Sequence, residues 1–233
     1  SDDILHPLAP GANWLEGTRF AGGTTKEEIE MWINGLGLTA AADSAAPVFN
    51  FETHTVMLNS GYEMPIMGLG TYSLSDEECY NSVTALLESG GRLIDTAYMY
   101  HNHKSEIAVR EAVVKRHPRD SFTLASKLPM SMLKDAEHQQ VVFDEQLEKC
   151  GVDYFDYYLL HNLTKTSYKK AEEFGSFAFA MQKKAEGKVR HVGFSFHDEA
   201  DLLDEILTKH PDVEFVQLQL NYIDWESQTI QSR

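Results

Sequence analysis

The feature that most constrains this sequence is a regular alternation of apolar strands and amphipathic helices after residue 56. The expected strands are continuous apolar runs, which indicates a parallel sheet covered on both faces. The expected strands lie at 66–72, 92–98, 122–129, 154–163, 189–197 and 215–225, and the expected helices lie at 75–91, 104–116, 135–151, 168–187 and 198–211.

Each strand–helix unit takes about thirty residues, close to one eighth of a typical ~250-residue (β/α)8 barrel. The sequence therefore predicts an α/β fold of the (β/α)8 TIM-barrel type that is incomplete, with about six of the eight units present. A doubly wound sheet has the same alternation and is the alternative. The segment GLGTYSLS at 68–75 lacks the GxGxxG fingerprint, which favours the barrel.

The N-terminal part does not share the strand–helix alternation of the rest of the sequence. Residues 1–37 include a segment with helix start and stop signals, TTKEEIEMWINGLG, and predict a short α/β remnant. Residues 38–50 are small, Ala-rich and contain a proline, so we interpret them as a linker. The barrel domain is then expected over 51–233, and it begins with a hairpin that turns at 59–61.

Composition excludes several functions. Lys and Arg number 20 and Asp and Glu number 36, and the net charge of −16 argues against nucleic acid or an anionic membrane as partner. Cys79 and Cys150 are the two cysteines, too few for a Cys-rich metal or iron–sulfur site. His101 and His103 lack an evident third ligand, so no metal is expected. With no long apolar run and no signal-peptide pattern, a cytoplasmic location is expected.

Strand after strand ends on a group that can ionise or form hydrogen bonds. These groups are Asp95, Lys127, His161, Ser195 and Gln217. In a parallel barrel the carboxyl ends of all strands surround one mouth. Side chains that are distant in the sequence are therefore expected to converge there.

Three of these side chains suggest proton transfer. A lysine at the end of a buried strand needs a partner, and Asp95 can supply it. An ammonium group such as that of Lys127 favours a phenolate, and so lowers the pKa of a nearby tyrosine, Tyr98 or Tyr100. Such a tyrosine can donate a proton to a carbonyl oxygen, while His161 orients the carbonyl or shares the proton. The alternative is that Lys127 and Asp95 form an ion pair with a purely structural role.

Four motifs resemble the aldo-keto reductases over residues 54–233. They are GLGTY at 68–72, IDTAxxY at 94–100, SK at 126–127 and LLH at 159–161, in that order and at barrel intervals. The resemblance implies a (β/α)8 barrel that uses NADP or NAD as NAD(P)H to reduce a small-molecule carbonyl, an aldehyde or a ketone.

The resemblance also implies roles for individual residues. The implied catalytic tetrad is Asp95, Tyr100, Lys127 and His161, with Tyr100 as general acid because it lies five residues after the aspartate. The implied cofactor contacts are Gly70, Thr71, Tyr72, Asn162, Ser195 and Gln217.

Two further resemblances concern the ends of the sequence. Residues 14–36 resemble the C-terminal strand and helix of flavodoxin-like domains, and residues 154–225 resemble a branch of the aldo-keto reductases often fused to ferredoxin-type iron–sulfur segments. Neither FMN nor an iron–sulfur cluster is expected to bind within this chain. Strands seven and eight are expected to be absent, so a catalytically inactive barrel fragment that binds nucleotide or a partner is the alternative function. The unclosed sheet edges are expected to favour self-association.

Overall fold

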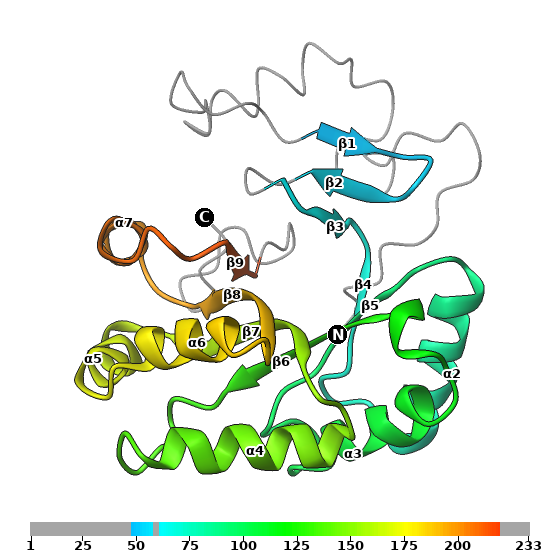
Figure 1. The fold of residues 1–233 in the computed structure, drawn as a ribbon, viewed down its shortest axis with the longest axis horizontal. Helices are drawn as coiled ribbons and strands as arrows, with labels where there is room; N and C mark the ends of the chain where they lie inside the picture. The colour runs from blue at the N-terminus through cyan, green and yellow to red at the C-terminus, as the bar shows by residue number, and fades with distance from the viewer. Residues whose placement is uncertain (1–47, 58–60, 220–233) are drawn as a thin grey trace. The chain divides into compact units, whose positions relative to one another are not determined.

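The computed structural model describes residues 48–57 and 61–219 (Figure 1). The chain divides into two compact units at the bond between Met64 and Pro65. The predicted flavodoxin-like remnant at 1–37 lies outside the described residues, as does the predicted linker up to residue 47. Both predictions stay untested.

The first unit, together with Pro65 at the end of β3, contains a small sheet of three short strands in the order β1-β2-β3. These strands are β1 (Val48–Asn50), β2 (Thr55–Met57) and β3 (Glu63–Pro65). β1 runs antiparallel to β2, and the side-chain oxygen of Asn50 accepts hydrogen bonds from the backbone of Glu52 and Thr53 in the connecting turn. The last three residues of the predicted linker thus form a strand. The hairpin predicted from residue 56 corresponds to β2 and β3.

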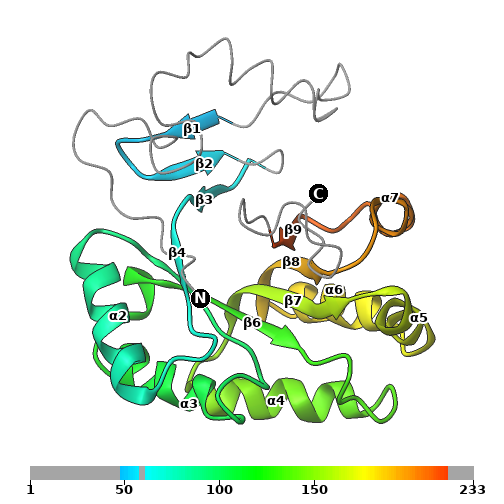
Figure 2. The same ribbon diagram turned by 180° about the vertical axis from the view of Figure 1, so that it is seen from behind.

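The second unit contains a parallel sheet of six strands in strict sequence order (Figure 2). The strands are β4 (Gly68–Gly70), β5 (Leu93–Asp95), β6 (Thr123–Leu128), β7 (Phe155–Leu163), β8 (Val189–Phe196) and β9 (Phe215–Leu218). A doubly wound sheet would reverse its strand order at a switch point. The described order has no reversal, so it fits the incomplete barrel and not the alternative.

Helices connect the strands and cover the outer side of the curved sheet (Figures 1 and 2). They are α2 (Asp76–Glu88), α3 (Ser105–Val109) with the π-helical turn η2 (Arg110–Val114), the 3₁₀ turn η3 (Arg119–Ser121), α4 (His138–Cys150), α5 (Lys165–Glu173), α6 (Ser176–Ala185) and α7 (Ala200–Lys209). Ser75 and Glu78 form the capping box expected at the start of α2. None of the described helices is long and apolar enough to cross a bilayer.

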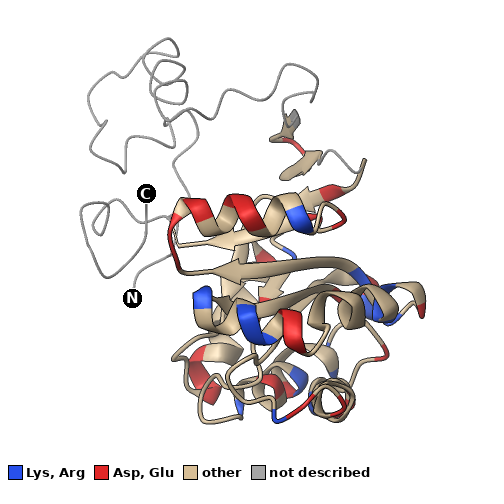
Figure 3. Cartoon of the chain, turned by 90° about the vertical axis from the view of Figure 1, so that its left-hand side faces the viewer, with Lys and Arg blue, Asp and Glu red and all other residues tan. Residues whose placement is uncertain are grey.

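α7 shows why such helices form on this surface. Ile206 is buried, whereas Asp201, Asp204 and Glu205 are exposed and are drawn in red in Figure 3. One apolar face packs inward and the acidic face meets water, which is the arrangement expected of an amphipathic helix. The excess of acidic residues in the sequence lies at least partly on such solvated faces.

Two differences from the sequence prediction concern helices. The single helix predicted over 168–187 is two helices, α5 and α6, which are separated at Gly175. The φ angle of Gly175 is +65°, a left-handed conformation that ends one helix before the next begins. The helix predicted over 104–116 continues from α3 into the π-helical turn η2.

The core lies between the sheet and its helices. All six residues of β6 are buried, and so are the first six of β7, from Phe155 to Leu160. The strands are therefore covered on both faces, as continuous apolar runs predict. Cys79 and Cys150 are buried within this core.

Candidate active site

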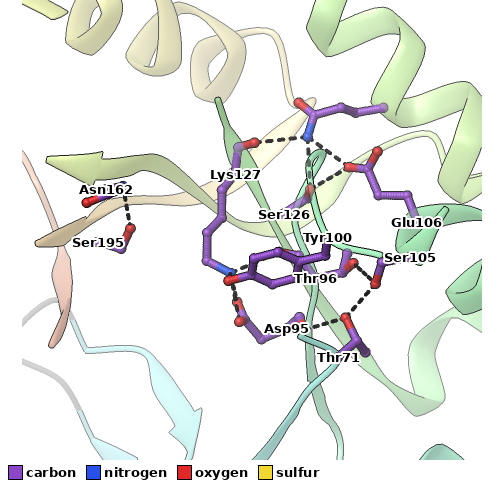
Figure 4. A network of polar contacts seen from close by, with 11 residues as sticks. Thr71, Asp95, Thr96, Tyr100, Ser105, Glu106, Ser126, Lys127, Asn162 and Ser195 are labelled. Atoms are coloured by element: carbon purple, nitrogen blue, oxygen red, sulfur yellow. Dashed lines mark hydrogen bonds and ion pairs between the residues drawn. The ribbon is translucent and has the colours of Figure 1, made fainter. Parts of the chain in front are cut away.

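Lys127 is the most buried charged group at the carboxyl ends of the strands. Its side chain is 1% exposed, and its Nζ lies 2.7 Å from each carboxylate oxygen of Asp95 on the neighbouring strand. Nζ also donates to the carbonyl oxygen of Thr96 at 2.9 Å (Figure 4). Because an unpaired buried ammonium is costly, these contacts fix both the charge and the direction of the lysine.

Tyr100 lies against this ion pair. Lys127 Nζ is 3.4 Å from its hydroxyl oxygen and 4.9 Å from the centre of its ring. Burial raises the pKa of Tyr100, the lysine opposes that rise, and the Asp95 charge adds to it. The expectation that the lysine would bring the tyrosine pKa below its ordinary value is therefore wrong for the net shift, because burial outweighs the nearby cation.

Tyr98, the other tyrosine that the sequence offers, belongs to a different cluster. Its hydroxyl donates to Glu145 at 2.8 Å, and the ammonium of Lys149 lies 4.1 Å from its ring centre. Both partners are on α4, on the outer side of the sheet. The structure therefore brings Tyr100, and not Tyr98, to the lysine.

His161 faces the ring of Tyr100 edge-on, with the ring centres 5.7 Å apart. Burial, with smaller contributions from Lys127 and His197, lowers the pKa of His161 to about 3. Its Nδ1 atom is buried and has no hydrogen-bond partner in the described part of the chain. A neutral imidazole at this place can donate one hydrogen bond into the space in front of Tyr100.

Asn162 follows His161 on β7, and Ser195 and Gln217 lie on the next two strands, β8 and β9. The Ser195 hydroxyl accepts the backbone N–H of Asn162 at 2.7 Å, and Ser195 is in register with Gln217. Asn162 has a φ of +57° and an exposed side chain. Its carboxamide has no hydrogen-bond partner within residues 48–57 and 61–219, so the amide remains able to bind a ligand.

Gly70 ends β4, next to Asp95 on β5, and Thr71 and Tyr72 follow it. Tyr72 is exposed, and its ring meets Tyr100 edge-on at a centre distance of 5.1 Å. Thr71 is buried, and both its backbone N–H and its hydroxyl donate to the carbonyl oxygen of Asp95. A Cβ at Gly70 would meet nothing within 4 Å, so this residue leaves open space above the strand end.

The structure adds a buried polar network that the strand-end argument missed, and Figure 4 shows part of it. Its members are Thr71, Thr96, Ser105, Glu106, Ser126, Gln146 and Tyr158. One sequence signal could have found part of it. Gln146 falls on the helical face that also carries the buried Val142 and Cys150, where a polar residue needs a partner.

Comparison with known proteins decides the family. The sequence model of the aldo/keto reductase family matches residues 66–233, which is most of the chain. The chain belongs to the aldo/keto reductase family. The family membership predicted from the four motifs is confirmed. The predicted resemblances to flavodoxin-like and ferredoxin-fused proteins are not tested.

Individual aldo/keto reductases are similar over the same region. An aldo-keto reductase of Mycobacterium avium is 38% identical over 160 residues, which is 68% of this chain and 53% of that protein. The crystal structure of an aldo/keto reductase from Brucella melitensis has a TM-score of 0.58 at 31% identity and covers 71% of this chain and 62% of its own. The structure of a Bombyx mori aldo-keto reductase in complex with NADP has a TM-score of 0.56 at 25% identity, with coverages of 72% and 58%. The chain spans about half the length of the curated relatives it matches.

Proposed function

We propose that this aldo/keto reductase chain carries the site for NAD(P)H-dependent reduction of an aldehyde or a ketone. The observation that supports the proposal best is the meeting of Asp95, Lys127, Tyr100 and His161 at the carboxyl ends of β5, β6 and β7. The Bombyx mori relative was solved in complex with NADP, which supports a nicotinamide cofactor.

In this proposal Tyr100 is the general acid. Its raised pKa keeps the phenol protonated at neutral pH, so a proton is available for an alkoxide that develops on the substrate. Lys127 stabilises the phenolate left behind, because its ammonium lies 3.4 Å from the phenol oxygen. Asp95 holds that ammonium in place through both of its carboxylate oxygens.

His161 orients the carbonyl in the same proposal. With a pKa of about 3, the imidazole is neutral at physiological pH and cannot serve as a cationic acid. It can still donate an N–H to the substrate oxygen beside Tyr100. Of the two roles that the sequence left open, orientation is therefore the one we propose.

The residues present suit a nicotinamide cofactor, which would supply the hydride when bound. The free carboxamide of Asn162 and the exposed amide of Gln217 are groups that can pair with a carboxamide. Ser195 would hold Asn162 in place, Tyr72 would offer an exposed ring, and Gly70 would leave room for the ligand. Thr71 would brace the site rather than contact the ligand, since its hydroxyl is already engaged by Asp95 and Ser105.

Replacing Tyr100 by Phe tests the proposal. Tyr100→Phe is expected to lower carbonyl reduction by at least ~100-fold, the usual contribution of a general acid, while NADPH still quenches the protein fluorescence. Tyr98→Phe is the matched control, because it also removes one phenolic hydroxyl nearby and is expected to keep the activity. Undiminished turnover in Tyr100→Phe would exclude the assignment.

The alternative is a fragment without catalytic activity that binds nucleotide or another protein. In the described part of the second unit, β4 and β9 each pair with one strand only, and this observation favours the alternative. We propose that these edges also allow the chain to self-associate. NADPH titration together with an assay for carbonyl reduction separates the candidates: binding without turnover supports the fragment, and turnover excludes it.

A further inference from the structure

Ser105 and Glu106 occupy the start of α3, directly after the loop that carries Tyr100. Both are buried, at 3% and 0% exposure. The Ser105 hydroxyl lies 2.7 Å from the Thr71 hydroxyl and 2.8 Å from the Thr96 hydroxyl, so it joins the end of β4 to the end of β5. The backbone N–H of Ser105 donates to the carbonyl oxygen of Tyr100.

Glu106 extends the same connection to β6 and α4. One of its carboxyl oxygens, Oε1, accepts from the Ser126 hydroxyl at 2.7 Å and from the Gln146 amide at 2.8 Å. The Gln146 amide also donates to the carbonyl oxygen of Lys127 at 3.1 Å, while its own oxygen accepts from Tyr158 at 2.7 Å. Figure 4 shows this carboxyl group on the far side of the strand from the Lys127 ammonium.

We propose that Glu106 is a positioning residue that fastens the segment bearing Tyr100 to the strand bearing Lys127, and that its carboxyl does so in the neutral form. Ser126 precedes Lys127, and the Gln146 amide donates to the Lys127 carbonyl. Among the described residues, Glu106 is the one side chain that forms hydrogen bonds to both Ser126 and Gln146. The inference deepens the proposed function and rests on it.

The surroundings of Glu106 explain why the neutral form is favoured. Its second oxygen, Oε2, is buried and has no partner among the described residues, and no cation forms an ion pair with it there. Burial raises its pKa to about 7, with the hydrogen bonds from Ser126 and Gln146 opposing the rise.

The other ionisable groups around Glu106 do not reverse that preference. Lys149 of α4 favours its ionised form and Glu145 of α4 disfavours it, both less than burial does. Cys150 of α4 and Tyr158 of β7 stay protonated near neutral pH, because burial raises the pKa of each well above its ordinary value. The pKa of Tyr98, in the preceding loop, is raised to about 12.

Ionisation would strengthen the two hydrogen bonds at Oε1 but leave a buried charge without solvation at Oε2, and burial outweighs those bonds in the Glu106 pKa, so we expect ionisation to loosen the contact between α3 and β6. A carboxylate at this place would need water or a cation at Oε2, and admitting water requires α3 to move away from β6. The relation between Tyr100 and Lys127 is then expected to change with a midpoint near pH 7, although burial raises the pKa of Tyr100 above its ordinary value.

The test follows the Tyr100 ring in the intact chain labelled with ¹³Cζ-tyrosine, with its resonance assigned by its loss in Tyr100→Phe. The resonance is expected to shift with a midpoint near pH 7, to lose that step in Glu106→Gln and to keep it in Glu111→Gln. Glu111 is the matched control because it lies one turn later and is exposed. Ser126→Ala removes a hydrogen bond that lowers the Glu106 pKa, so the midpoint is expected to move upward. That variant also serves if Glu106→Gln does not fold.

Hydrogen exchange gives a second readout. If the open segment has an ordinary carboxyl pKa, protection of residues 98–109, corrected for intrinsic exchange, should fall about tenfold between pH 6.0 and 8.5 in the parent and stay level in Glu106→Gln. A missing step in the parent, the same step in Glu106→Gln, or an unchanged midpoint in Ser126→Ala overturns the inference. None of these readouts uses carbonyl reduction, so the inference can fail while Tyr100→Phe still supports the proposed function, and the reverse also holds.

Discussion

At the scale of single residues, Lys127 places the strictest demand on its neighbours, because its ammonium is buried. A buried ammonium is tolerated only when its charge is matched, and both oxygens of Asp95 and the Thr96 carbonyl match it. This demand is met by an acidic side chain at the carboxyl end of the neighbouring strand β5. The Tyr100 hydroxyl, at 3.4 Å, is a fourth neighbour of an ammonium that has three N–H donors, so it shares a donor with the shorter contacts.

Replacing Lys127 by Met tests the role of the cation. The substitution keeps most of the side-chain volume, leaves Asp95 without its partner and removes the group that opposes the raised pKa of Tyr100. We expect kcat for carbonyl reduction to fall by about 100-fold or more. Lys149→Met removes an ammonium from the ring of Tyr98 instead and should retain activity. Equal rates in both variants would contradict the role of Lys127.

The ring of His161 should not titrate in the physiological range. Its pKa of about 3 lies below the ordinary value of 6.5, so ¹⁵N resonances of the ring should stay constant between pH 5 and 8. The unfolded chain in urea should titrate near 6.5. Because the folded pKa is the lower one, this group's contribution to stability is present above pH 6.5 and is lost as the pH falls toward 3. An inflection between pH 5 and 8 in the native ring signals would disprove the neutral assignment.

At the scale of elements, Gly175 divides what the sequence indicates as one helix. The chain must reverse its local hand between α5 and α6, and a residue with φ of +65° does so at no steric cost when it is glycine. The site depends on this break indirectly, because α5 and α6 both cover the outer face near β7.

Gly175→Ala should destabilise the protein by about 1 kcal/mol. An added Cβ would meet nothing within 4 Å, so the cost comes from the backbone conformation and not from a clash. Urea unfolding measures the difference. Gly193→Ala is the contrasting variant: its Cβ would lie 2.6 Å from Phe215, and a larger loss is expected. A neutral Gly175→Ala would show that the left-handed conformation is not required.

The sequence predicts elements whose causes are local. The capping box at Ser75 and the polar ends of the strands are readable because each depends on neighbours within a few residues or on the parallel order of the sheet. The Glu106 network joins residues 20 to 40 positions apart, so the helical position of Gln146 indicates that this side chain needs a buried partner but not which residues supply it. The net pKa of Tyr100 was mispredicted for a related reason, since burial depends on the whole fold.

At the scale of the whole molecule, the sheet of the second unit has two edges in its described part. β4 and β9 expose backbone N–H and C=O groups that a further strand could pair with. Leu218, at the end of β9, is 42% exposed and adds apolar surface to that edge.

We expect self-association that depends on these edges. Sedimentation velocity should show a mean mass that rises with protein concentration. Leu218→Lys adds a charge at the end of β9 and is expected to reduce this rise in mean mass. A proline at Val216 is a poorer choice, because Val216 lies where β9 pairs with β8 and the substitution would also disturb the fold. A monomer at all concentrations would exclude the prediction.

The order of the strands also bears on how the chain is made. Within residues 61–219, every strand of this sheet from β5 onward pairs with the strand that precedes it in the sequence. This order would allow the sheet to be extended one strand at a time, from the N-terminal side, as the polypeptide leaves the ribosome. Asp95 is then synthesised and placed in the sheet before Lys127, so the ion-pair partner of the lysine is present when β6 is added.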